Sequence, residues 1–147
     1  MTTRAKSAKQ HAPVPVEAAR IIPKIQEVCT VLNPESKNEW DKRVEVIKSL
    51  DALADKIHGL SAESQDALGS VLIKLGGALA SQIIDLRSEV TGSTFEILPK
   101  LCSKLNFSRA MQEVMPQLIE QSGSTNSVIR VQARVAAEAC MRSVLCK

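Results

Sequence analysis

The residue types that most often carry catalysis or metal binding are sparse in this chain. Its two histidines are His11 and His58, and neither has a cysteine or carboxylate at the spacing of a metal site. No Cys-x-x-Cys, His-Glu-x-x-His or P-loop pattern occurs. Gly76-Gly77 lies in an apolar helical stretch without a following Lys-Ser/Thr pair, so we expect close helix packing there rather than phosphate contact. The sequence predicts no enzymatic activity, no metal and no cofactor.

The cysteines and the N-terminal residues bear on location. The first twelve residues are polar and basic with no apolar stretch behind them, which is unlike a secretory signal. No apolar run approaches the roughly 20 residues that span a bilayer. We therefore expect a cytoplasmic protein without membrane contact, whose cysteines are reduced and mostly buried: Cys29, Cys102, Cys140 and Cys146.

The formal charge of +3 is concentrated at one end of the chain. Arg4, Lys6 and Lys9 occur within residues 1–12, which hold no acidic residue, and the rest of the chain is balanced. The body is therefore not a polycation suited to a phosphate backbone, and nucleic acid is not a predicted partner. Residues 1–14 are predicted to be a disordered basic tail that could strengthen binding to an acidic surface.

Apolar spacing predicts six helices. Ile21, Ile25, Val28 and Leu32 form one stripe of a helix over 16–32, which Asn33-Pro34 ends. Five further helices follow. Gly92 and Pro99 are expected to kink or interrupt the fourth of the six helices, the second helix of the second pair. The predicted starts of these five helices are the caps Asn38, Ser61, Asp85 and Asn106, and Ser127 for the last.

Arginines recur along this helical chain with a regular period. Arg43, Arg87 and Arg130 each open the second helix of a pair, at spacings of 44 and 43 residues. Two helices in 40–47 residues are typical of HEAT or armadillo repeats. We therefore predict an all-α fold, an α-α superhelix (solenoid) of three HEAT-like helical hairpins over about 15–59, 60–105 and 106–147.

The turns within such hairpins line one edge of the solenoid, here residues 33–41, 81–87 and 122–130. Trp40 is the only tryptophan and stands in a polar run, so it is either folded back on its hairpin or exposed as an interface anchor. The recurring arginines have the same two interpretations, since arginines at helix starts often bond to carboxylates and carbonyls of the neighbouring repeat. The residues alone leave both alternatives open.

Two strings in these turns resemble a known family. Trp40-Asp-Lys-Arg43-Val and Gln82-Ile-Ile-Asp85-Leu-Arg87-Ser-Glu-Val90 are similar to the amino-terminal half of a TOG domain of the CLASP type, over about residues 20–146. The resemblance implies HEAT repeats that bind αβ-tubulin or microtubules through their intra-repeat turns, and a place on the microtubule cytoskeleton. The tubulin-binding residues that it implies are Trp40, Lys42 and Arg43, then Ile84, Asp85 and Arg87, then Asn126, Ser127 and Arg130.

The chain departs from the family in two ways. Ile84 and Ser127 stand where relatives commonly have lysine, and three hairpins are present where the family has six repeats. Both departures lower the expected affinity for tubulin. Two other functions stay open: an adaptor for a different protein, and self-association through the last hairpin, where Ala133, Ala136, Ala137 and Ala139 are small enough for a close-packed neighbour.

Overall fold

The computed structural model describes residues 13–34, 39–85 and 87–145, and these residues form helices without any strand. The basic tail predicted over 1–14 lies outside the described residues, apart from its last two. No helix in the described part combines the length and the apolar character that crossing a membrane requires. The helices are α2 (Val16–Leu32), α3 (Trp40–His58), α4 (Ala62–Ala67), α5 (Gly69–Ile83), α6 (Ser88–Lys104), α7 (Met111–Gln121) and α8 (Ser127–Leu145).

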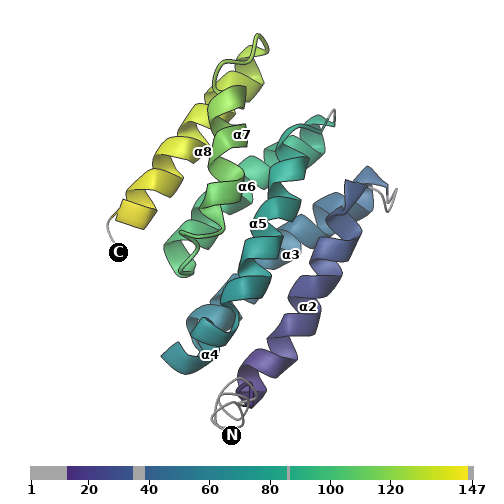
Figure 1. Cartoon of the computed structure of the whole chain (residues 1–147). Coiled ribbons are helices and arrows are strands. Elements are labelled where there is room, and N and C mark those ends of the chain that lie inside the picture. Colours follow the sequence, from purple (N-terminus) through teal and green to yellow (C-terminus); the bar gives the residue numbers. More distant parts are fainter. Residues whose placement is uncertain (1–12, 35–38, 86, 146–147) are drawn as a thin grey trace, which may run out of the picture.

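The helices stack as three hairpins in two layers (Figure 1). α2, α5 and α7 form one layer, in which α5 packs between the other two. α3, α6 and α8 form the second layer, in which α6 has the same central place. The predicted all-α, solenoid-like fold is thereby confirmed.

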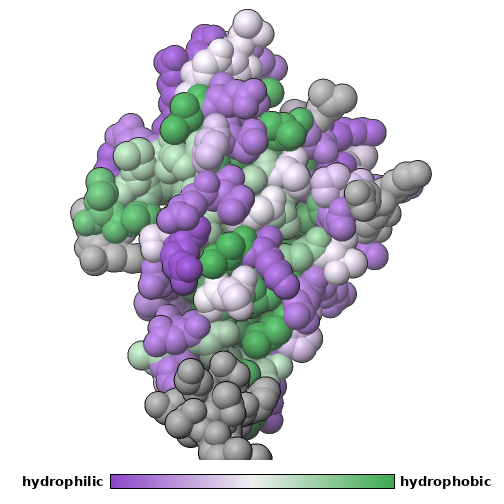
Figure 2. Space-filling view, viewed as in Figure 1, coloured by the Kyte–Doolittle hydropathy of each residue, from purple (hydrophilic) through white to green (hydrophobic). Residues whose placement is uncertain are grey.

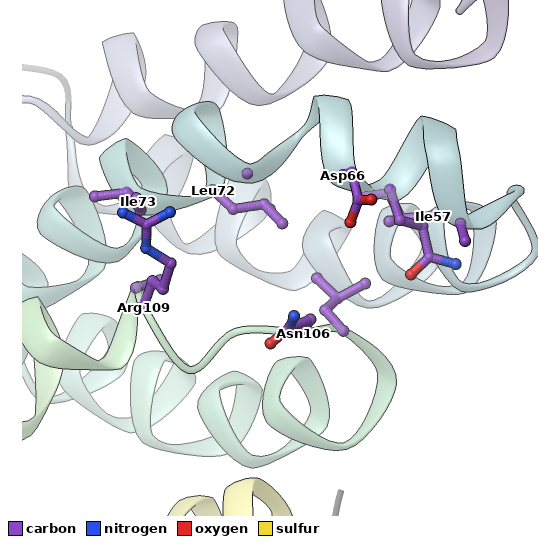
Figure 3. A pocket seen from close by; sticks show the side chains of 11 residues that line it. Ile57, Asp66, Leu72, Ile73, Asn106 and Arg109 are labelled. Atoms are coloured by element: carbon purple, nitrogen blue, oxygen red, sulfur yellow. The ribbon is translucent and has the colours of Figure 1, made fainter.

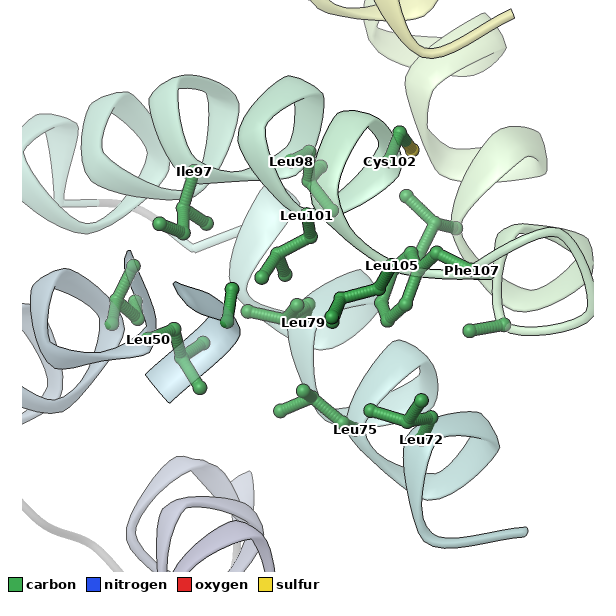
Figure 4. Packing of buried hydrophobic residues seen from close by; sticks show 14 of the residues in the cluster. Leu50, Leu72, Leu75, Leu79, Ile97, Leu98, Leu101, Cys102, Leu105 and Phe107 are labelled. Atoms are coloured by element: carbon green, nitrogen blue, oxygen red, sulfur yellow. The ribbon is translucent and has the colours of Figure 1, made fainter. Parts of the chain in front are cut away.

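A single apolar core runs through the stack (Figure 4). Leu50 of α3, Leu79 of α5 and Leu101 of α6 point toward one another, and each is no more than 1% exposed. Fully burying a leucine side chain contributes about 1.5–3 kcal/mol. Because Leu50 comes from the first hairpin and Leu79 and Leu101 come from the second, the apolar stripe of one hairpin is covered only when the next one stacks on it.

The third predicted helix is divided in the structure. Ser61 caps it as predicted, since its Oγ accepts the backbone N–H of Ser64 at 3.2 Å. The helix then breaks at Leu68, where α4 ends and α5 begins. Leu68 is fully buried and Gly69 follows it, so a weak helix former stands where the chain changes direction.

Three of the predicted caps are wrong. Asn38 lies outside the described residues, and Glu39 occupies the N-cap position of α3 without a side-chain bond. Arg87, not Asp85, occupies the N-cap position of α6, and the Asp85 carboxylate instead accepts the backbone N–H of Arg87 and pairs with an arginine of another hairpin. Asn106 is followed by a turn instead of a helix, and α7 begins only at Met111.

The second helix of the second hairpin is more regular than expected. α6 is one helix from Ser88 to Lys104 with Pro99 inside it, so the interruption predicted at Gly92 and Pro99 is absent there. The proline ring removes one backbone bond from a helix interior. Packing against α3 on one side and α8 on the other compensates for that loss.

Two of the predicted buried thiols meet between α6 and α8. Cys102 and Cys140 are both fully buried, and a hydrogen bond between them, together with burial, raises the pKa of the Cys140 thiol. Cys29 is half-buried, and its pKa is raised chiefly by burial. Cys146 lies outside the described residues.

The alanines of α8 do not form the free surface that the sequence suggested. Ala133 and Ala136 are at most 1% exposed and belong to the core, while Ala137 and Ala139 are half-buried. Since α6 packs along this helix, the small residues serve close packing within the chain instead.

Polar contacts join the C-terminal half of α3 to the C-terminal end of α6. The Lys104 Nζ lies 2.6 Å from Asp51 Oδ1 and 2.9 Å from Asp55 Oδ1. The hydrogen bond from Lys104 holds the pKa of the Asp51 carboxyl below its ordinary value. His58 was expected to meet free carbonyls at a helix end, and its Nδ1 donates to the carbonyl of Lys104, 2.9 Å away, at the end of α6.

Gly76 and Gly77 provide a direct test of the packing. A Cβ on Gly76 would lie 2.6 Å from the carbonyl oxygen of Ala110, which confirms close packing at this position, whereas a Cβ on Gly77 would meet nothing within 4 Å. We expect Gly76→Ala to lower the free energy of unfolding by about 1–3 kcal/mol, the range for an overpacked core.

The matched variant Gly77→Ala should leave stability unchanged or raise it by up to about 1 kcal/mol, because alanine favours the helix. Urea unfolding followed by circular dichroism measures both variants. Equal effects of the two substitutions would contradict the close approach of α5 to Ala110.

Candidate functional site

The three intra-hairpin turns lie along one edge of the molecule (Figure 1). They join α2 to α3, α5 to α6, and α7 to α8. α4, the start of α2 and the end of α8 lie toward the opposite edge. This arrangement follows from stacking, because parallel hairpins place equivalent turns side by side.

Trp40 begins α3 at the first turn and is half-buried. Its ring packs against the core on one side. The guanidinium carbon of Arg87 lies 5.2 Å from the ring centroid, a cation–π contact between two hairpins. The indole is therefore intermediate between the two predicted alternatives. It packs against the core of the hairpins, and the exposed Arg87 side chain lies over its ring.

Arg43 connects the first turn to the second. Its Nη1 donates to Asp85 Oδ2 at 2.5 Å and to Gln82 Oε1 at 2.9 Å. Both Arg43 and Asp85 side chains are only 19% exposed, and Arg43 Nε is buried without a partner. Arg43 therefore takes the structural role left open by the sequence, bonding to a carboxylate of the neighbouring hairpin.

Asp85 also contacts Arg87, so that one carboxylate bonds to both arginines. Its second oxygen, Oδ1, accepts the backbone N–H of Arg87 at 2.8 Å. The carboxylate thus fixes the start of α6 while it pairs with Arg43. As a consequence Arg87 is held where its guanidinium reaches the Trp40 ring.

Gln82 is a site residue that the sequence reasoning did not single out. It is 2% exposed, and its Nε2 donates to the Leu32 carbonyl at 2.7 Å, at the end of α2. One side chain therefore joins the end of α2 to Arg43 at the start of α3. Its position, three residues after Leu79 on a buried stripe, is the signal that could have identified it.

The third turn is organised separately. Asn126 Oδ1 accepts the backbone N–H of Val128 and Ile129 at 3.0 and 3.2 Å, and so caps α8. Arg130 Nη1 donates to the Ser124 carbonyl at 3.0 Å, and Ser127 is exposed at the helix start. This arginine serves its own turn rather than a neighbouring hairpin.

The edge presents both polar and apolar groups to solvent. Glu39, Trp40, Arg43 and Arg87 line a cavity of about 380 Å³ at the first two turns. Lys42, which precedes the lining residue Arg43 in the chain, is exposed. Ile84 is 54% exposed in the second turn. The structure therefore brings together Trp40 with Arg87 and Arg43 with Asp85, while Asn126, Ser127 and Arg130 share the edge without joining that group.

A second cavity, of about 360 Å³, lies at the opposite edge (Figure 3). Leu72 and Ile57 form part of its apolar lining, and Asp66 and Arg109 stand on different sides of it. None of the tubulin-binding residues that the resemblance implies lines this cavity. Residues 13–34, 39–85 and 87–145 include no group of three His, Cys, Asp or Glu residues that could hold a metal ion.

Comparisons with known proteins do not identify the chain. No protein-family model, curated protein or solved structure matches it. A function must therefore be argued from the turn edge and from the residues that the sequence places there.

The connection between the first two turns can be measured by a double-mutant cycle. We expect Arg43→Met and Asp85→Ala to be coupled by about 1–3 kcal/mol in the free energy of unfolding, because each change strands a partly buried polar partner. Chemical denaturation of the wild type, both single variants and the double variant gives the coupling.

The control cycle is Arg142→Met with Glu138→Ala, whose side chains are 68% and 72% exposed. Exposed pairs within one helix couple by about 0.3–0.5 kcal/mol. A coupling between Arg43 and Asp85 no larger than that of this pair would show that the two turns are not joined by it.

Proposed function

We propose that this chain is a non-enzymatic binding module, similar to half of a TOG domain, that binds tubulin through its turn edge. The observation that carries the proposal is the pairing of Trp40 with Arg87 at that edge, across two hairpins. The stack of two-helix hairpins with recurring arginines supports a HEAT-like assignment. The Trp40 and Asp85–Arg87 strings support the TOG resemblance.

The chemistry of the edge fits recognition of a protein surface. Tryptophan and arginine are the residues most enriched among interface hot spots. Because Asp85 and Gln82 hold the first two turns together, these groups are positioned before a partner arrives, which reduces the entropy lost on binding. The positive charge of residues 1–12 would speed encounter with the acidic tubulin surface.

The same edge predicts modest affinity. Ile84 and Ser127 replace the lysines common in relatives, and three hairpins offer a shorter row of turns than six repeats do. Binding should therefore be strongest at low salt, where exposed charges are least screened.

One observation favours a second candidate function, an adaptor for a protein other than tubulin. Ile84 is 54% exposed in the middle of the row of turns. An isoleucine there would suit a partner with an apolar patch better than an acidic one. A pull-down enriched in one non-tubulin protein, and weakened by Ile84→Lys, would support this function.

The experiment that tests the proposal is co-sedimentation with microtubules, together with size-exclusion chromatography with free tubulin. We expect Trp40→Ala and Arg87→Glu each to weaken binding about tenfold or more, as loss of an interface hot spot does. Circular dichroism checks that the Trp40 variant, which loses a half-buried ring, stays folded.

Arg20→Glu is the matched control, because Arg20 is exposed on α2, away from the turn edge, and the charge change is the same. This variant should bind as the wild type does. If the wild-type chain binds neither microtubules nor free tubulin at low salt, or if Arg20→Glu weakens binding as much as Arg87→Glu, the proposal fails.

A further inference from the structure

The cavity at the edge opposite the turns has the composition of a ligand site. Its volume of about 360 Å³ lies within the range of about 300–1,000 Å³ that is typical of sites for small molecules. The end of α3, α4, the start of α5 and the chain between α6 and α7 all contribute to it. Its apolar floor consists of side chains that are at most 5% exposed: Ile57, Leu72, Leu105 and Ala110.

Contacts within the chain hold the wall of this cavity in place. Gln65 Nε2 donates to the carbonyl of Leu60 at 3.0 Å and to that of His58 at 3.4 Å, which joins α4 to the end of α3. The break between α4 and α5 follows at Leu68. A Cβ on Gly69, which also lines the cavity, would meet nothing within 4 Å, so there is open space at this break. A preformed wall reduces the entropy lost when a ligand binds.

Two opposite charges stand on different sides of the cavity. Asp66 of α4 and Arg109 of the α6–α7 connection are both exposed, and Leu72 lies between them in Figure 3. Among residues 13–34, 39–85 and 87–145, neither charged side chain has a hydrogen-bond or ion-pair partner. Both charges are therefore available to a ligand that carries a positive and a negative group apart from each other.

An amide lies on the wall together with these charges. Asn106 lines the cavity, and its Oδ1 accepts the Ser108 hydroxyl at 3.1 Å. Its Nδ2 is a donor that suits the carbonyl oxygen of a ligand. The cavity thus combines an apolar floor with groups complementary to an ammonium, a carboxylate and a carbonyl.

We propose that this cavity binds a short peptide whose two termini are free. The terminal ammonium pairs with Asp66, the terminal carboxylate pairs with Arg109, and an apolar side chain between them lies against Leu72. An extended tripeptide spans about 10 Å, at about 3.3–3.6 Å per residue, so its charged ends can reach different sides of the cavity.

The charges and the surrounding surface favour this ligand over two others. A fatty acid or an amine carries a single charge, which would meet a like charge on one side of the cavity and leave the other side unpaired. Over α2, α5 and α7, Figure 2 shows hydrophobic groups in small separate areas among hydrophilic ones. A broad apolar contact with a folded protein has no counterpart there, whereas a small ligand needs only the cavity.

Titration of the isotope-labelled chain with the tripeptide Ala-Leu-Ala, followed by NMR, tests the site. The peptide should shift the backbone signals of the residues that line the cavity, among them Leu72, Ile73 and Asn106. Ala-Ala-Ala should bind about tenfold more weakly or worse, because the leucine side chain supplies the apolar burial. Acetylating the amino end or amidating the carboxyl end should weaken binding about two- to fivefold, the range for an exposed ion pair.

Paired changes in protein and ligand assign each terminus to its partner. Asp66→Asn should weaken the free peptide about two- to fivefold but bind the acetylated peptide as the wild type does, because that peptide has no ammonium to lose. Arg109→Gln should behave in the same way toward the amidated peptide. Asp41→Asn is the matched control: Asp41 is exposed at the start of α3, at the turn edge, and this variant should bind every peptide as the wild type does.

Three results would overturn the proposal. The free tripeptide could give no saturable shifts, or shifts confined to the turn edge. Peptides with blocked termini could bind as tightly as the free one. Finally, Asp66→Asn could weaken the acetylated peptide as much as the free peptide, which would mean that the carboxylate does not meet the ammonium.

Discussion

The constraint on which the rest of this structure depends is that no helical hairpin can cover its own apolar stripe. α6 is buried only because α3 and α8 pack on either side of it, and α5 depends in the same way on α2 and α7. Parallel stacking then has a geometric consequence, since equivalent turns must fall on one edge. The candidate binding site is therefore produced by the packing that buries the core.

Polar contacts between hairpins refine what apolar packing begins. Apolar contacts are non-directional and would tolerate small shifts between neighbouring hairpins. Arg43, Asp85 and Gln82 remove that freedom at the first two turns, because their bonds require defined distances and angles. The position of Arg87 over Trp40 depends on this group, so the binding surface and the alignment of the hairpins share the same residues.

The sequence by itself determined the helices and their repetition, because both depend on local spacing: α2 ends at Leu32 and α8 begins at Ser127 as predicted, and the arginine period places the three turns. Tertiary structure alone decided what happens where hairpins meet. Asp85 pairs with Arg43 of another hairpin, Gln82 becomes a buried connector, and Arg87 lies over the half-buried Trp40 ring. Such contacts join residues far apart in the chain, and only the stacking that buries the core brings them within bonding distance.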